Sequence, residues 1–225
     1  MHQPAGVDLS RVWALVPIRG LETAKTRLGG DLDAGERTGL VTELLRRTLV
    51  AARDAAGITG TIVVTMDAAA ADLAKRHRAI GLVERAPGLN EAIEAARSVA
   101  IARGATAVLV VPADLPAIST GALDGLLGGA GKALAGGAGG GSGIGALGGL
   151  VGVVADQHGR GTNALLLSPP TVIAPAFGAD SRMKHESAAH QAGARFLELE
   201  SPLSLDVDTS ADLLIAEAAL GSLRG

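Results

Sequence analysis

The feature that most constrains the fold is the alternation of short apolar runs with segments of helical periodicity. Runs rich in Val, Leu, Ile and Ala occur at residues 12–16, 61–65, 107–111, 151–155 and 164–167. Continuous apolar runs are typical of strands buried on both faces, and helical segments between them are typical of parallel crossovers. The pattern therefore predicts an α/β fold with a mostly parallel sheet and helices on both faces.

Composition bounds the size of the core and excludes several classes of function. The chain has 225 residues, 48% of them apolar, which predicts one domain over residues 1–225. A net charge of −3, two Phe, one Trp and no Tyr argue against a nucleic-acid polymer as partner. The absence of cysteine excludes disulfides, thiolate metal sites and a cysteine nucleophile.

The sequence has no signal for export or for a membrane. Residues 1–10 have no basic region followed by an apolar run, and no uninterrupted apolar stretch reaches membrane-spanning length. We therefore expect a soluble, cytoplasmic protein without a membrane partner. The sequence leaves the oligomeric state open, with a homo-oligomer as one outcome.

Two helices have recognisable ends. Asp33, with Glu36 three residues later, predicts a capping box before a run of periodic leucines, and Gly57 ends that segment. Asn90 is predicted to cap a second helix, which ends at Gly104. Both helices are expected to cover the sheet.

A glycine- and alanine-rich segment covers about residues 128–149. Such a run loses much conformational entropy on ordering and has little side-chain surface to bury. We interpret it as a flexible surface insertion that follows a short helix. The alternative is a glycine-rich phosphate loop, but the segment lacks the strand, turn and helix that frame such a loop.

A basic loop follows the first predicted strand. Pro17 and Gly20 form its turn, and Arg19, Lys25 and Arg27 supply three cations. Backbone N–H groups and basic side chains in such a turn could hold a polyphosphate, although the spacing is that of neither a Walker loop nor Gly-x-Gly-x-x-Gly. The alternative is a solvated basic turn.

Three aspartates are candidate ligands for a divalent cation. Asp114 follows the predicted strand 107–111 between two prolines, at the sheet edge where α/β proteins bind ligands. Asp206 and Asp208 are two positions apart in an extended stretch, so their side chains are expected to point the same way. The alternatives are a turn residue for Asp114 and a helix-start charge for Asp208.

Two further segments each place a hydroxyl residue after a glycine-containing turn. Thr162 ends the first, at residues 156–163, and Ser181 ends the second, which contains Gly178. Ser181 also begins a predicted helix that reaches about residue 192. Backbone amides and hydroxyls at such positions could converge on a phosphate or carboxylate, and the alternative is ordinary turn and cap chemistry.

The histidines do not point to hydrolysis. His185 lies one helical turn after Ser181, and it and Arg182 either contact the anion or lie on the surface. His77 and His158 have no nucleophile nearby in sequence, and no Gly-x-Ser-x-Gly elbow is present.

Together these segments resemble the CofC-like family of phospholactate or phosphoenolpyruvate guanylyltransferases, which act in the biosynthesis of the deazaflavin coenzyme F-420. The resemblance covers nearly the whole chain, in family order. The matching segments are VPIRGLETAKTRL from Val16, LNEAI from Leu89, PADLPAI from Pro112, GRGTNALLLSPP from Gly159, FGADSRMKH from Phe177 and DVDTSADL from Asp206.

The resemblance implies a Rossmann-like, glycosyltransferase-A-type nucleotidyltransferase domain and a role for each candidate residue. The substrates would be GTP and a phosphorylated three-carbon acid, with Mg²⁺ as cofactor. The nucleotide-binding residues would be Pro17, Arg19, Gly20, Lys25, Arg27 and Asn90. The metal ligands would be Asp114, Asp206 and Asp208, the acid-binding residues Thr162, Gly178 and Ser181, and the catalytic residues Lys25 and Asp114.

Two other functions remain open at the level of sequence. A sugar-1-phosphate or molybdopterin-type nucleotidyltransferase would share the basic loop and Asp114, but not the paired pockets at Thr162 and Ser181. A nucleotide-binding module without turnover would bind GTP and release no pyrophosphate.

Overall fold

The structure is a computed structural model that describes residues 6–21, 33–85, 88–136 and 148–205. In chain order, the elements of these residues are β1 (Val12–Pro17), α1 (Ala34–Asp54), β2 (Ile58–Thr65), α2 (Ala68–Arg76), β3 (Ile80–Val83), α3 (Leu89–Ala102), β4 (Ala107–Val110), α4 (Thr120–Gly136), β5 (Leu150–Ala155), β6 (Thr162–Ser168), α5 (Ser181–Gln191), β7 (Arg195–Glu198) and the 3₁₀ helix η4 (Pro202–Ser204).

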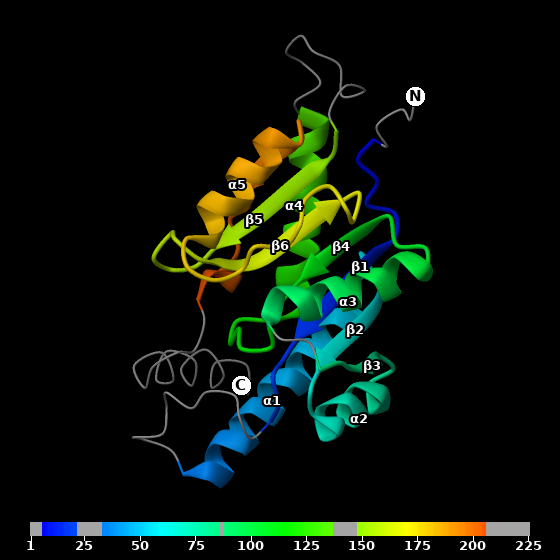
Figure 1. The fold of residues 1–225 in the computed structure, drawn as a ribbon, viewed down its shortest axis with the longest axis vertical. Helices are drawn as coiled ribbons and strands as arrows, with labels where there is room; N and C mark the ends of the chain where they lie inside the picture. The colour runs from blue at the N-terminus through cyan, green and yellow to red at the C-terminus, as the bar shows by residue number, and fades with distance from the viewer. Residues whose placement is uncertain (1–5, 22–32, 86–87, 137–147, 206–225) are drawn as a thin grey trace.

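The described strands form one sheet in the order β3-β2-β1-β4-β6-β5-β7. Neighbouring strands are parallel except where β6 pairs with β4 and with β5. Helices pack against both faces, as Figure 1 shows, with α3 and α5 on one face and α1 and α4 on the other. The predicted α/β architecture is therefore confirmed.

The alternation of side chains along β1 shows why its sequence is apolar at every position. Ala14 faces the core cluster that includes α1 and α4, whereas Trp13 and Leu15 face the cluster that includes α3 and α5. A strand covered on both sides has no solvent-facing positions, so it cannot show the alternation of apolar and polar residues. All six residues of β1 are buried.

Helix α1 begins at the predicted capping box. The Asp33 carboxylate accepts a hydrogen bond from the backbone N–H of Glu36 at 2.8 Å, and the Glu36 carboxylate accepts one from the Asp33 N–H at 2.8 Å. These two bonds satisfy donors that a helix start leaves unpaired. The helix then buries Leu44, Leu45 and Leu49.

We expect Asp33→Ala to lower the free energy of unfolding by about 1 kcal/mol, since the N–H of Glu36 loses its acceptor. Urea denaturation followed by circular dichroism measures this change. Asp54→Ala, at the other end of α1, is the control because its carboxylate pairs with the exposed Arg53 side chain. Equal unfolding midpoints for Asp33→Ala and the unmodified protein would contradict the role of the cap.

The structure differs from the sequence-based predictions in three respects. The helix α4 continues to Gly136, so the predicted flexible insertion at 128–149 is helical in its first part, and residues 137–147 lie outside the described residues. Asn90 does not cap α3, because the N-cap residue is Gly88. The short elements α2, β3 and β7 were not predicted.

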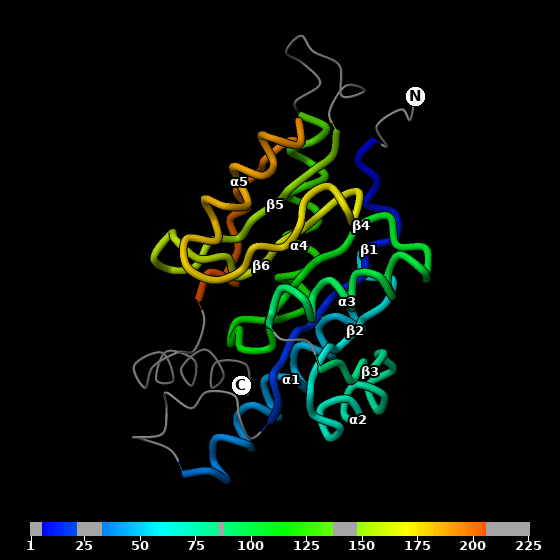
Figure 2. Tube along the Cα trace, viewed as in Figure 1, coloured from blue at the N-terminus to red at the C-terminus, as the bar shows by residue number. Residues whose placement is uncertain are grey.

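The topology brings the candidate segments to one edge of the sheet. β1, β4 and β5 all end at this edge, because β6 is antiparallel to both β4 and β5. For the same reason β6 begins there. The trace in Figure 2 shows the turn between β5 and β6 and the start of α5 beside each other.

No helix within the described ranges is long and apolar enough to cross a membrane.

Candidate functional site

The start of the basic loop is attached to the end of β2. Pro17 is the last residue of β1, and the next residue, Ile18, donates its N–H to the carbonyl oxygen of Val64 at 3.0 Å. The Arg19 carbonyl oxygen accepts from the Met66 N–H at 3.4 Å. These contacts fix the backbone of the turn while the Arg19 side chain stays exposed.

The backbone of this turn retains donors for an anion. Within the described ranges, neither the Arg19 N–H nor the Gly20 N–H has a hydrogen-bond acceptor, whereas the Leu21 N–H donates to Asp67 Oδ2 at 2.9 Å. Adjacent N–H groups without acceptors can bind a phosphate oxygen. The other two predicted cations, Lys25 and Arg27, lie outside the described residues.

Asp114 lies just after β4, the strand that pairs with β1. The pairing of β1 and β4 places Leu15 opposite Val110, and the Val111 N–H extends it by donating to the Leu15 carbonyl at 2.9 Å. The turn that carries Asp114 therefore leaves the sheet beside the basic loop. The Asp114 side chain is half-buried.

The described part of the predicted metal site holds one carboxylate, that of Asp114. Mg²⁺ in nucleotide sites is held by one or two carboxylates together with substrate phosphates. Asp114 supplies one carboxylate next to the turn with unpaired N–H groups, and the predicted ligands Asp206 and Asp208 lie outside the described residues. No cluster of three or more His, Asp or Glu side chains suited to a metal occurs within the described residues.

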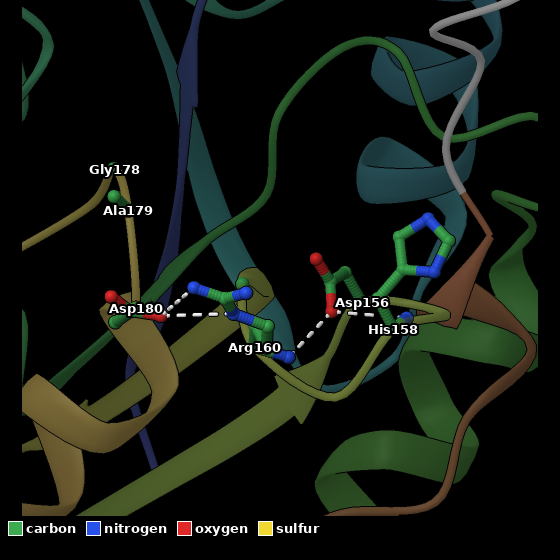
Figure 3. Close-up of a pocket in the computed structure, with 7 residues that line it drawn as sticks. Asp156, His158, Arg160, Gly178, Ala179 and Asp180 are labelled. Carbon is green, nitrogen blue, oxygen red and sulfur yellow. Dashed lines mark hydrogen bonds and ion pairs between the residues drawn. The ribbon is translucent and has the colours of Figure 1, made fainter.

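The turn between β5 and β6 is organised around Asp156. Its Oδ1 accepts from the backbone N–H groups of His158 at 3.2 Å and Arg160 at 2.9 Å, as Figure 3 shows. Its own N–H donates to the Gly161 carbonyl at 3.3 Å. The carboxylate thus stabilises the turn that precedes β6.

An ion pair joins this turn to the start of α5. Arg160 donates from Nε and from a terminal guanidinium nitrogen to Asp180 Oδ1, at 3.0 and 2.7 Å (Figure 3). The hydrogen bond that Arg160 donates to the Asp180 carboxylate raises the pKa of Arg160. The Arg160 carbonyl also accepts from the Arg182 N–H at 3.1 Å. The two predicted anion segments therefore contact each other.

A pocket of about 540 Å³ lies between these two segments. Asp156, His158, Arg160 and Gly161 line it from the β5–β6 turn, and residues 178–180 line it from the loop before α5. Gly178 has a φ of 122°, a conformation that side chains disfavour. Asp156, Arg160 and Asp180 lie within the two predicted segments, but their residue types alone did not indicate these contacts.

The predicted hydroxyl residues are buried and directly follow residues that line this pocket. Ser181 begins α5, as predicted, and is 1% exposed, with its N–H donating to the Gly178 carbonyl at 3.2 Å. Thr162 begins β6, directly after Gly161, and is 8% exposed. The structure thus gathers Thr162, Gly178 and Ser181 at one place.

Asn90 clamps the loop that leads to Gly178. Its amide nitrogen donates to the Phe177 carbonyl at 3.2 Å, and its amide oxygen accepts from the Phe177 N–H at 2.8 Å. An amide that serves the donor and the acceptor of one residue fixes the backbone there. This contact spans residues far apart in the chain, so a single sequence could not reveal it.

His185 and Arg182 have partners that the sequence did not indicate. The His185 side chain is completely buried, so a surface position is wrong, and burial lowers its pKa to about 4. Arg182 forms an ion pair with Glu198 at 2.5 Å and lies 5.8 Å from the centre of the Phe196 ring. Arg182 thus attaches α5 to β7.

A comparison with solved structures identifies the fold. The chain matches the crystal structure of a 4-diphosphocytidyl-2C-methyl-D-erythritol synthase with a TM-score of 0.62 and 16% identity, over 94% of this chain and 98% of that one. The two chains therefore share a single-sheet α/β fold.

Sequence comparison identifies the family. Residues 12–147 match the family model described as "Guanylyl transferase CofC like". The phosphoenolpyruvate guanylyltransferases of Sphaerobacter thermophilus and Rubrobacter xylanophilus are 37% and 38% identical, each over 93% of this chain and 95% of the relative. The chain belongs to the CofC-like guanylyl transferase family, which confirms the resemblance, and is thereby a nucleotidyltransferase enzyme.

Proposed function

We propose that this protein transfers the guanylyl group of GTP to a phosphorylated three-carbon acid and releases pyrophosphate. Phosphoenolpyruvate is the first candidate, because the relatives at 37% and 38% identity carry that name. The product would be enolpyruvoyl-2-diphospho-5′-guanosine, or the lactyl compound if the acid is 2-phospho-L-lactate. The family resemblance assigns this step to deazaflavin coenzyme biosynthesis.

The observation that carries the proposal is that a basic turn and a pocket lie at the same edge of the sheet. The first is the turn at Arg19 and Gly20, whose N–H groups have no acceptor within the described ranges. The second is the pocket beside Gly178 and Arg160. A transfer between two phosphorylated substrates requires two such places that face a common centre.

The chemistry needs positioning and charge neutralisation more than proton transfer. A phosphate oxygen of the acid attacks the α-phosphorus of GTP, a new P–O bond forms, and the bond from the α-phosphorus to the bridging oxygen of pyrophosphate breaks. The second pKa of a phosphate monoester is about 6, so the nucleophile is already ionised near neutral pH. No general base is required.

Each residue has a role in this proposal. The loop with Pro17, Arg19, Gly20, Lys25 and Arg27 holds the phosphates of GTP, and its cations stabilise the leaving pyrophosphate. Asp114, with Asp206 and Asp208, holds Mg²⁺, which would neutralise charge on the phosphates when bound. Thr162, Gly178 and Ser181 hold the acid. Asn90, proposed to seat the nucleotide, also fixes the loop at Phe177.

The direct test combines purified protein, Mg²⁺ and GTP with phosphoenolpyruvate, 2-phospho-L-lactate or 3-phosphoglycerate, and identifies the nucleotide product by mass. We expect stoichiometric pyrophosphate release and a guanosine diphosphate ester with one of these acids. Removal of Mg²⁺ with EDTA should abolish both signals, and added Mg²⁺ should restore them. ATP and CTP in parallel reactions test the choice of base.

The same experiment separates the alternatives. Product formation from a sugar 1-phosphate, with none from the three acids, would favour another nucleotidyltransferase activity. GTP binding without pyrophosphate release for every acceptor would favour a module without turnover. Either outcome would overturn the proposed reaction.

A further inference from the structure

His185 lies between the two segments that form the acid pocket. Its ring Nδ1 is 3.0 Å from the Thr162 hydroxyl oxygen on β6, and its Nε2 accepts from the Ala176 N–H at 3.0 Å. Ala176 immediately precedes the residue that Asn90 clamps. One completely buried ring therefore contacts both β6 and the loop that leads to Gly178.

These contacts determine which ring nitrogen carries the proton. A backbone N–H can only donate, so Nε2 must offer a lone pair to Ala176 and cannot be protonated. A neutral imidazole then has its proton on Nδ1. Burial keeps the ring neutral near pH 7 by lowering its pKa. Nδ1 therefore donates, and the Thr162 oxygen accepts.

The direction of this hydrogen bond decides where the Thr162 hydroxyl proton can point. That proton cannot be directed at Nδ1, which already carries one. Within the described ranges, the Thr162 hydroxyl has no hydrogen-bond partner other than His185. No group within the described ranges takes this proton, and Gly161, the residue before Thr162, lines the pocket.

We propose that His185 is a positioning residue, whose ring holds the Thr162 hydroxyl so that the hydroxyl proton is presented to the phosphorylated acid beside Gly178. This inference rests on the proposed function of the pocket. A hydroxyl fixed as an acceptor on one side is a prepared donor on the other, so an anionic oxygen gains a hydrogen bond without reorganising the site. His185 itself does not touch the substrate.

The first test replaces His185 with a side chain that can keep only one of the two hydrogen bonds of the ring. In His185→Gln the side-chain oxygen can take the place of Nε2 and accept from Ala176, but no donor atom stands at the position of Nδ1 to hold the Thr162 oxygen. We expect the KM for the acid to rise about tenfold and the KM for GTP to stay within about twofold. His190→Gln, at an exposed position of α5, is the matched control and should leave both values unchanged.

A double-mutant cycle with Thr162→Val tests whether His185 acts through the hydroxyl. We expect Thr162→Val alone to raise the KM for the acid about tenfold, and His185→Gln to add no further increase in that background. Thr162→Ser, which keeps a hydroxyl, should restore most of the affinity. Independent, multiplying effects of the two substitutions would overturn the proposal and leave His185 a structural role.

The premise has its own test, which does not depend on turnover. Nitrogen-15 NMR of the unmodified protein should show His185 with a protonated Nδ1 and an unprotonated Nε2. A proton on Nε2 would overturn the inference. If the unmodified protein makes no product from any acid, the proposed function fails. The affinity for inorganic phosphate is then compared between the unmodified protein and His185→Gln. A weaker affinity in His185→Gln would support the positioning role, and equal affinities would overturn it.

Discussion

Replacing Asp114 with Asn is expected to lower kcat about a hundredfold or more without unfolding the protein. The substitution keeps the shape of the side chain and removes the negative charge that would hold Mg²⁺ against the phosphates. Asp114 is half-buried in the turn after β4, beside the basic loop, so an amide of the same size can be accommodated. The initial rate of pyrophosphate release measures the effect.

The control is Asp72→Asn, which makes the same chemical change at an exposed position of α2, where Asp72 pairs with Lys75. Thermal unfolding of both variants, followed by circular dichroism, establishes that the fold is retained. Near-normal turnover by a folded Asp114→Asn protein would remove Asp114 from the metal site.

Acid should destabilise the protein through His185. Burial is the main cause that lowers the pKa of His185 from 6.5 to about 4, with the charge of Lys184 as a smaller one. Between these two pH values the unfolded chain binds a proton at this residue and the folded chain does not, so stability falls as the pH falls. The loss should reach about 3 kcal/mol near pH 4 and vanish above pH 6.5.

Urea denaturation at several pH values between 7 and 4 measures this slope. Other groups also titrate in this range, so the His185→Gln variant, which cannot titrate at this position, supplies the reference. We expect its unfolding free energy to fall less steeply with acid than that of the unmodified protein. Parallel curves for the two proteins would mean that folding does not lower the pKa of His185.

The sequence allowed the central part of the fold to be predicted. The strands at residues 12–16, 61–65, 107–111, 151–155 and 164–167 were all found, because each belongs to a strand covered on both faces and reads as an apolar run. The capping box of Asp33 was also confirmed, since it depends on residues three positions apart. Helix caps and strands that are buried on both faces can therefore be recognised from the sequence alone.

The elements that were missed lie where these patterns weaken. β3 and β7 are short strands at the two edges of the sheet, and their residues are mostly half-buried. The glycine-rich part of α4 has low helix propensity, but its helix is supported by leucines packed against α1 and the sheet. Tertiary packing overrides propensity there.

The sequence indicated individual residues of the candidate site, but not the contacts between them. The hydroxyl and glycine positions at Thr162, Gly178 and Ser181 follow from turn chemistry and the family resemblance. The clamp of Asn90 on Phe177 and the burial of His185 depend on contacts between distant segments, which carry no local pattern. Contacts of this kind become visible only in the three-dimensional structure.

The reversed direction of β6 has a consequence for how such an enzyme can diversify. Because β6 begins at the edge where β1 and β4 end, residues 148–205 supply the proposed acid side and residues 6–21 and 107–114 the proposed nucleotide side. Acceptor preference and nucleotide preference are then encoded in separate stretches of the gene. If the proposed function holds, we expect an exchange of residues 148–205 between relatives to change the acceptor and to leave the nucleotide unchanged.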